Sequence, residues 1–222
     1  MTIHLRKEID RLKQKVLSLS AHVEQAVHDA VKSISERDEE LAARTMENDK
    51  TIDQMEVEVE EECLKILALH QPVANDLRFI IAVLKINNDL ERIGDQAVNI
   101  ARGALYLSKH EPVEMPFDLS NMADKVKLML KRSIDSLVNL NAGEAHEISL
   151  MDDEIDDLHH QMYGVVERGI LSHPERIECL IQFLSASRQL ERIADHATNI
   201  AEDVIYMIEG EIFRHRMQDF KA

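Results

Sequence analysis

Glycine, proline and cysteine are scarce in this sequence. Its 222 residues include six Gly, four Pro and two Cys. So few turn-forming residues leave little room for the frequent tight turns of a β-rich fold. No apolar run approaches the roughly 20 residues that a membrane-spanning helix needs, so we do not expect the chain to be embedded in a membrane. The abundance of Leu, Ile, Ala, Glu and Lys instead favours long helices and an all-α fold.

The two cysteines and the N-terminal segment indicate a cytoplasmic protein. Cys63 and Cys179 lie far apart, and each is followed by leucine, which suits reduced, packed thiols better than a disulfide framework. Residues 1–10 carry four charged side chains and no apolar core of an export signal. We therefore expect the protein to reside in the cytoplasm.

Basic side chains are few relative to acidic ones. The sequence has 26 Lys and Arg against 42 Asp and Glu, which gives a formal net charge of −16. A surface with this excess repels the phosphates of nucleic acids and of anionic lipids. We expect no nucleic-acid partner, and contact with membranes only through protein partners.

Apolar residues recur at steps of three and four along six stretches, which is the pattern of amphipathic helices. Breaks near Arg37 and Asp38 and at Pro72 separate three helices in the first half. Residues 109–117 (KHEPVEMPF), with two prolines, are typical of a linker. We therefore predict two tandem three-helix bundles, 1–110 and 117–222, whose consecutive helices run antiparallel. The stripes of the first and third helices are Leu5, Ile9, Leu12, Val16, Leu19, Val23 and Ala26, and Val83, Ile86, Leu90, Ile93, Ala97 and Ile100.

An internal repeat is the most informative feature of the sequence. Residues 90–101 read LERIGDQAVNIA, and residues 190–201 read LERIADHATNIA. Apolar periodicity alone does not explain why Glu, Arg, Asp and Asn recur at matching polar positions. The chain is therefore predicted to be a tandem repeat. Upstream, the repeat continues at Val23, Asp49, Asp53 and His70, which match Val126, Asp152, Asp156 and His173.

Each repeat places two carboxylates and an asparagine on one helix face. Residues four apart project from the same side of a helix, and like charges at this spacing call for a compensating cation. In an antiparallel hairpin, residues equally distant from the turn lie opposite one another, so the preceding helix adds two further carboxylates to each face. The predicted sets are Asp49, Asp53, Glu91, Asp95 and Asn99 in the first half, and Asp152, Asp156, Glu191, Asp195 and Asn199 in the second.

Four facing carboxylates predict a site for a hard or intermediate cation. Oxygen-rich, sulfur-free ligands favour iron or manganese over structural zinc, with zinc and magnesium as further candidates. The alternative is a solvated acidic face whose charge is offset by Arg92 and Arg192. His159 and His196 have no histidine counterpart in the first half and are more typical of surface residues than of ligands.

The segment 71–78 (QPVANDLR), together with LERIGDQAVNIA and its repeat, resembles the PhoU family of phosphate-uptake regulators over essentially the whole chain. The resemblance implies two three-helix bundles related by pseudo-twofold symmetry, a homodimer, and multinuclear iron or other metal held by the Glu/Asp-x-x-x-Asp motifs. It also implies an adaptor between the phosphate ABC transporter and the sensor histidine kinase that restrains the phosphate-starvation response when phosphate is plentiful. The second half departs from the pattern, because it has HPERIECL in place of QPVANDLR.

Two other functions compete with this one. A carboxylate-bridged di-iron enzyme would need Glu-x-x-His on two helices of one bundle, whereas this chain offers only Asp156-x-x-His159. A metal-free scaffold would use its acids for solubility alone. No Gly-rich phosphate loop, nucleophile elbow or zinc-binding cysteine pair is present, so we expect no enzymatic activity and weak or absent binding of free phosphate to metal-free protein.

Overall fold

Six α-helices make up nearly all of the chain that a computed structural model describes, residues 3–113 and 117–210. A single 3-10 turn precedes the last helix, and these residues contain no β-strand. The all-α prediction is confirmed, while residues 114–116 of the predicted linker lie outside the described residues. The helices are α1 (Ile3–Glu36), α2 (Glu39–His70), α3 (Ala74–Ser108), α4 (Leu119–Asn139), α5 (Ala142–Ser172) and α6 (Ile177–Glu209), with the 3-10 turn at Pro174–Arg176.

The helix ends in the first half fall where the sequence predicted breaks. The Asp38 side chain accepts a hydrogen bond from the backbone N–H of Leu41 at 2.9 Å, which satisfies a free donor at the start of α2. Gln71 ends α2 in the left-handed conformation, with φ 44°, directly before Pro72. Only residues 71–73 separate α2 from α3. So short a connection makes the two helices antiparallel neighbours.

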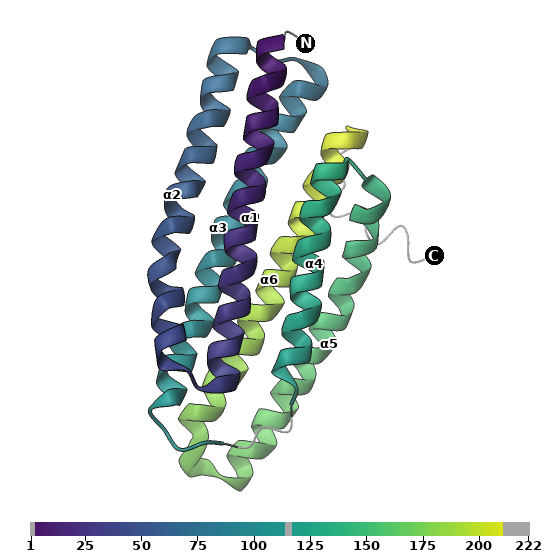
Figure 1. Ribbon diagram of the computed structural model, residues 1–222. Helices are drawn as coiled ribbons and strands as arrows, with labels where there is room; N and C mark the ends of the chain where they lie inside the picture. Colours follow the sequence, from purple (N-terminus) through teal and green to yellow (C-terminus); the bar gives the residue numbers. More distant parts are fainter. Residues whose placement is uncertain (1–2, 114–116, 211–222) are drawn as a thin grey trace, which may run out of the picture.

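The helices form two three-helix bundles that lie side by side (Figure 1). In each half the three helices pack on one another, α1 with α2 and α3, and α4 with α5 and α6. Between the halves α3 packs against α6, and α1 contacts α4. The two tandem bundles are therefore confirmed, and four of the six helices meet between them. None of the described helices is both long enough and apolar enough to cross a bilayer.

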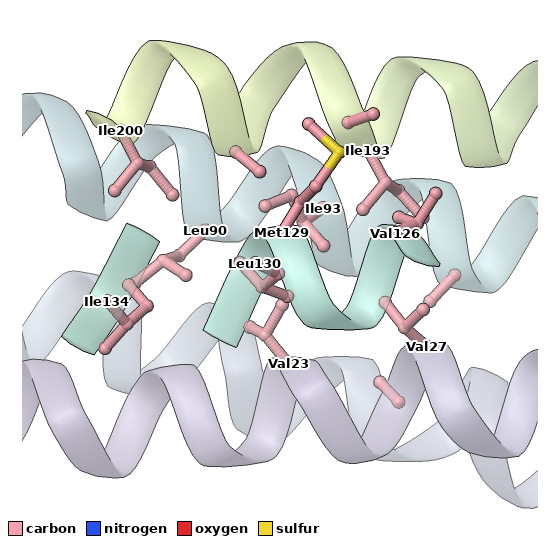
Figure 2. Packing of buried hydrophobic residues seen from close by; sticks show 14 of the residues in the cluster. Val23, Val27, Leu90, Ile93, Val126, Met129, Leu130, Ile134, Ile193 and Ile200 are labelled. Carbon is pink, nitrogen blue, oxygen red and sulfur yellow. The ribbon is translucent and has the colours of Figure 1, made fainter. Parts of the chain in front are cut away.

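Buried apolar side chains form one continuous core through both bundles. All residues of the predicted first and third stripes belong to it, and Leu12, Leu19 and Leu90 have no exposed surface. Figure 2 shows side chains of α1, α3, α4 and α6 meeting between the bundles, among them Leu90, Met129 and Ile193. Burial of each such side chain contributes about 1.5–3 kcal/mol to folding. The same hydrophobic contacts thus stabilise each bundle and hold the two together.

Polar pairs line the contact between α3 and α6, which we call the α3–α6 seam. Lys85 Nζ lies 2.9 Å from Asp203 Oδ1, and Asp203 is only 2% exposed. Further along, His196 Nδ1 lies 2.8 Å from Asp89 Oδ1. The partners follow each other in opposite order along the two helices, so α3 and α6 run antiparallel. The α3–α6 seam was not predicted from the sequence.

Candidate metal sites

The first helical hairpin has the register that places the predicted carboxylates opposite each other. Asn87 Nδ2 on α3 donates a hydrogen bond to the backbone oxygen of Glu56 on α2 at 2.9 Å. Two turns further along α3, a Cβ added at Gly94 would lie 3.2 Å from the Ile52 side chain and 3.5 Å from Asp49 Oδ1. This close approach of the two backbones brings α2 and α3 together at the level of the carboxylates. We call Asp49, Asp53, Glu91 and Asp95 the first acidic cluster.

Electrostatics show that members of the first acidic cluster act on one another. Burial raises the pKa of Asp49, and the neighbouring charges of Asp53 and Asp95 raise it further. The pKa of Glu91 is raised for the same reasons, first by burial and then by Asp95, with a smaller rise from Asp53. Carboxylates on different helices therefore disfavour each other's ionised form. A cation placed among them would relieve this repulsion.

The second hairpin repeats the arrangement. His159 Nδ1 on α5 lies 3.0 Å from Ser187 Oγ on α6, which fixes the predicted register of these helices. We call Asp152, Asp156, Glu191 and Asp195 the second acidic cluster.

Repulsion within the second acidic cluster is pronounced at Asp152. Burial, followed by the charges of Asp195 and Asp156, raises the pKa of Asp152 to about 6. Burial also raises the pKa of Glu191 and that of Asp195, and Asp156 adds to both. All four carboxylates thus lie close enough to influence one another.

The two predicted asparagines have other partners. Asn99 Oδ1 accepts a hydrogen bond from Arg102 one turn along α3 at 3.0 Å. Asn199 Nδ2 lies 3.5 Å from Asp89 Oδ1, across the α3–α6 seam. His196, which the sequence indicated as a surface residue, is only 19% exposed in its side chain because it pairs with the same Asp89. The signal that could have identified this pair is chemical, since Asp89 and His196 are complementary, but no spacing rule connects residues so distant in sequence.

The carboxylates are grouped but not closed around a common point. In the described parts of the chain, no three or more His, Cys, Asp or Glu side chains are arranged so as to hold a metal ion. Like charges separate when their side chains are free to rotate, and Asp53 and Asp156 are exposed. The backbone register and an all-oxygen donor set suit a hard cation.

Two tandem three-helix bundles, each with an acidic cluster on the hairpin of its last two helices, define a class of repeated helical protein. The family model described as the PhoU domain matches this chain twice, over residues 16–104 and 119–204. The chain therefore belongs to the PhoU family.

Relatives and solved structures agree with this assignment over nearly the full length. The chain is 36% identical over 212 residues to the phosphate-specific transport system accessory protein PhoU homolog of Aquifex aeolicus, covering 96% of each chain. It is 33% identical to the homolog of Clostridium acetobutylicum, covering 92% of this chain and 94% of that one. The crystal structure of PhoU from Pseudomonas aeruginosa matches with a TM-score of 0.88 at 34% identity, over 93% of this chain and 99% of that one. The phosphate transport system regulatory protein PhoU from Streptococcus pneumoniae matches with a TM-score of 0.84 at 30% identity, over 94% and 98%.

Proposed function

We propose that this protein is a cytoplasmic regulator of phosphate uptake that acts as an accessory of the phosphate-specific transport system. In this role it connects the phosphate ABC transporter to a sensor histidine kinase and restrains the phosphate-starvation response when phosphate is plentiful. The observation that carries the proposal is the PhoU domain match in both halves. Relatives that align over more than nine-tenths of the chain bear the name of accessory proteins of this transport system.

The proposed action is binding rather than catalysis. The relatives are named accessory or regulatory proteins, which supports a non-enzymatic role. Of the two Glu-x-x-His motifs that a di-iron site needs, the sequence offers only the related Asp156-x-x-His159. We expect the protein to form a homodimer, which light scattering coupled to size exclusion will test.

Metal binding at both acidic clusters is the second part of the proposal. Its support is the pairing of raised carboxyl pKa values with an oxygen-only donor set on facing helices. Iron is the first candidate, followed by manganese, zinc and magnesium, because carboxylates bind all of them and availability decides among them. When bound, the cation would neutralise the clusters and fix the spacing of the two helices of each hairpin. The residues that would hold it are Asp49, Asp53, Glu91 and Asp95, and Asp152, Asp156, Glu191 and Asp195, with Asn99 and Asn199 at the edge of each face.

Deletion of the gene in its host tests the regulatory role. Phosphatase expression in phosphate-rich medium should be switched on in the deletion strain and repressed again by a plasmid carrying the wild-type gene. Unchanged expression in the deletion strain would refute the proposal. The same strain complemented with cluster variants then reports whether the acidic clusters take part in regulation.

Elemental analysis of gently purified protein tests the metal sites directly. The test variant has Glu91, Asp95, Glu191 and Asp195 changed to Ala, and it should lose the metal that wild-type protein carries. The matched control changes four exposed acids outside the clusters, Glu47, Glu61, Asp157 and Glu167, to Ala, which alters net charge equally. A wild-type protein that is folded, metal-free and unable to take up added iron, manganese or zinc would reduce the clusters to a solvated face. Calorimetric titration of protein freed of metal by a chelator should show weak or no phosphate binding.

A further inference from the structure

A groove on the second bundle continues from the acidic cluster toward the turn between α5 and α6, at the lower end of the molecule in Figure 1. Its volume is about 530 Å³. The side chains that matter here come from both helices of the hairpin: His159, Tyr163, Ile181, Leu184, Arg188 and Arg192. We call this surface the α5–α6 groove.

The α5–α6 groove is positively charged in a chain whose net charge is −16. No Asp or Glu lines it. Arg188 and Arg192 stand four residues apart on one face of α6. Among the described residues neither guanidinium forms a salt bridge, and their charges offset only part of the rise in the pKa of the neighbouring Glu191. Burial lowers the pKa of His159, so its imidazole is mainly neutral near pH 7 and the charge of the groove belongs to the two arginines.

The repeat provides an internal comparison, because the first half lacks this groove chemistry. Glu56 occupies the position that corresponds to His159, and Glu60 the position that corresponds to Tyr163. Arg92, the counterpart of Arg192, lies 3.7 Å from the carboxylate of its neighbour Glu91. The same place on the first bundle therefore carries more acidic side chains.

Large apolar side chains are exposed beside the two arginines. Tyr163 is 61% exposed and Ile181 is 46% exposed. A surface that joins apolar side chains to guanidiniums suits a polypeptide better than a small anion, because an inorganic anion would leave the apolar side chains uncovered. Arginine is also the cation best suited to carboxylates at an interface, since its planar head binds them through two hydrogen bonds.

We propose that the α5–α6 groove is a docking surface for an acidic segment of a partner protein, whose carboxylates bind Arg188 and Arg192 and whose apolar side chain packs on Tyr163 and Ile181. This inference rests on the proposed adaptor function in one respect, namely that the molecule bound in the groove is a protein. It gives the second half a role in partner recognition that the first half does not share.

Binding of a synthetic peptide tests the groove with the intact protein. The probe is a short fluorescein-labelled peptide of glutamates around one leucine, followed by fluorescence anisotropy at low ionic strength. The Arg188→Gln plus Arg192→Gln variant should bind the peptide at least about tenfold more weakly, because it removes both charges that pair with the peptide carboxylates. Tyr163→Ala should weaken binding by a smaller factor. Added salt should weaken wild-type binding, because exposed charge pairs are screened.

The matched control is Arg92→Gln, which removes the corresponding arginine from the first bundle and should leave peptide affinity within about twofold of wild type. Circular dichroism melting confirms that each variant is folded. Equal binding of a peptide with glutamines in place of glutamates would overturn the proposal, as would an equal loss in Arg92→Gln. Displacement of the peptide by inorganic phosphate, but not by sodium chloride of the same ionic strength, would show a small-anion site instead and would also overturn it.

The peptide assay and the phosphatase assay can refute the two proposals separately. A groove that binds no peptide, in a protein whose deletion switches on phosphatase expression, would remove the docking surface and leave the regulatory role. Peptide binding that depends on Arg188 and Arg192, with no effect of deletion, would do the reverse.

Discussion

Removal of one partly buried charge, by Asp152→Asn, should stabilise the metal-free protein at neutral pH. A carboxyl in the unfolded chain titrates near 3.8, whereas burial and the charges of Asp195 and Asp156 raise the pKa of Asp152 to about 6 in the folded protein. The folded state therefore holds protons more tightly between these two values. Stability falls as pH rises through this window, and the loss persists at higher pH because the carboxylate is then ionised in an unfavourable place.

The magnitude follows from the difference between the two pKa values. Each tenfold change in proton affinity corresponds to about 1.4 kcal/mol, so the difference sets a ceiling of about 3 kcal/mol. Asp152 is only partly buried and titrates together with its neighbours, and solvent screening reduces the expected gain for Asp152→Asn to about 1 kcal/mol. For a chain of this length, 1 kcal/mol corresponds to a rise in Tm of about 2–4 °C.

The assay is thermal unfolding of chelated wild type and Asp152→Asn, followed by circular dichroism at about pH 4.5 and about pH 7.5. The difference in Tm should be small at the lower pH and larger at the higher one. Asp157→Asn, an exposed position on the same helix outside the cluster, is the control and should change Tm little at either pH.

Added manganese or ferrous iron should reverse the order of stability, because a bound ion stabilises the folded state in proportion to its affinity and the variant has lost a charged ligand. An Asp152→Asn protein that melts below wild type in chelator at neutral pH would refute the argument that the cluster is repulsive. A gain of equal size at both pH values would show that the effect does not come from ionisation of Asp152.

Three further perturbations address the core and the seam. Leu90→Ala removes a fully buried side chain between the bundles. It should lower the free energy of unfolding, measured by urea titration, by about 2–5 kcal/mol. A loss under about 1 kcal/mol would contradict a core shared by both halves. Lys85→Ala should lower the free energy of unfolding by about 3 kcal/mol, because it removes the cation that pairs with the buried Asp203. The double variant Lys85→Met with Asp203→Leu should recover most of that loss. A double variant no more stable than Lys85→Ala would argue against the ion pair. Burial raises the pKa of the Cys63 thiol to about 12. In a Cys179→Ser background, Cys63 should therefore react with a disulfide reagent near pH 8 only after unfolding. Rapid labelling of the native protein would show that Cys63 is accessible.

The helices and the hairpin register could be predicted because both depend on local rules. Stripes at steps of three and four identify the buried faces, as at Leu12 and Leu90, and both residues are fully buried. The turn before Pro72 sets which residues of α2 and α3 face each other, and the Asn87 to Glu56 hydrogen bond agrees with that count. A short loop leaves little freedom of register, so counting from it is sufficient.

The contact between the bundles could not be predicted in the same way. No short loop joins α3 to α6, and the seam pairs such as Asp89 with His196 are more than a hundred residues apart in sequence. Inside one repeat, His196 has only Gln96 as its counterpart, so self-comparison gave it no function. The α5–α6 groove was missed for a related reason, since it is defined by where the two repeats differ rather than by where they agree.

The antiparallel packing of α3 on α6 has a thermodynamic consequence. Glu91 and Asp95 of the first acidic cluster lie on α3, and Glu191 and Asp195 of the second lie on α6. Each cluster therefore includes residues of a helix that packs against a helix of the other cluster. An adjustment of α3 that closes the first cluster around an ion would be felt by α6 through the seam. The free energies of ion binding at the two clusters would then be coupled. Binding of an ion to the first cluster would change the ion affinity of the second by some factor, and binding to the second would change the affinity of the first by the same factor.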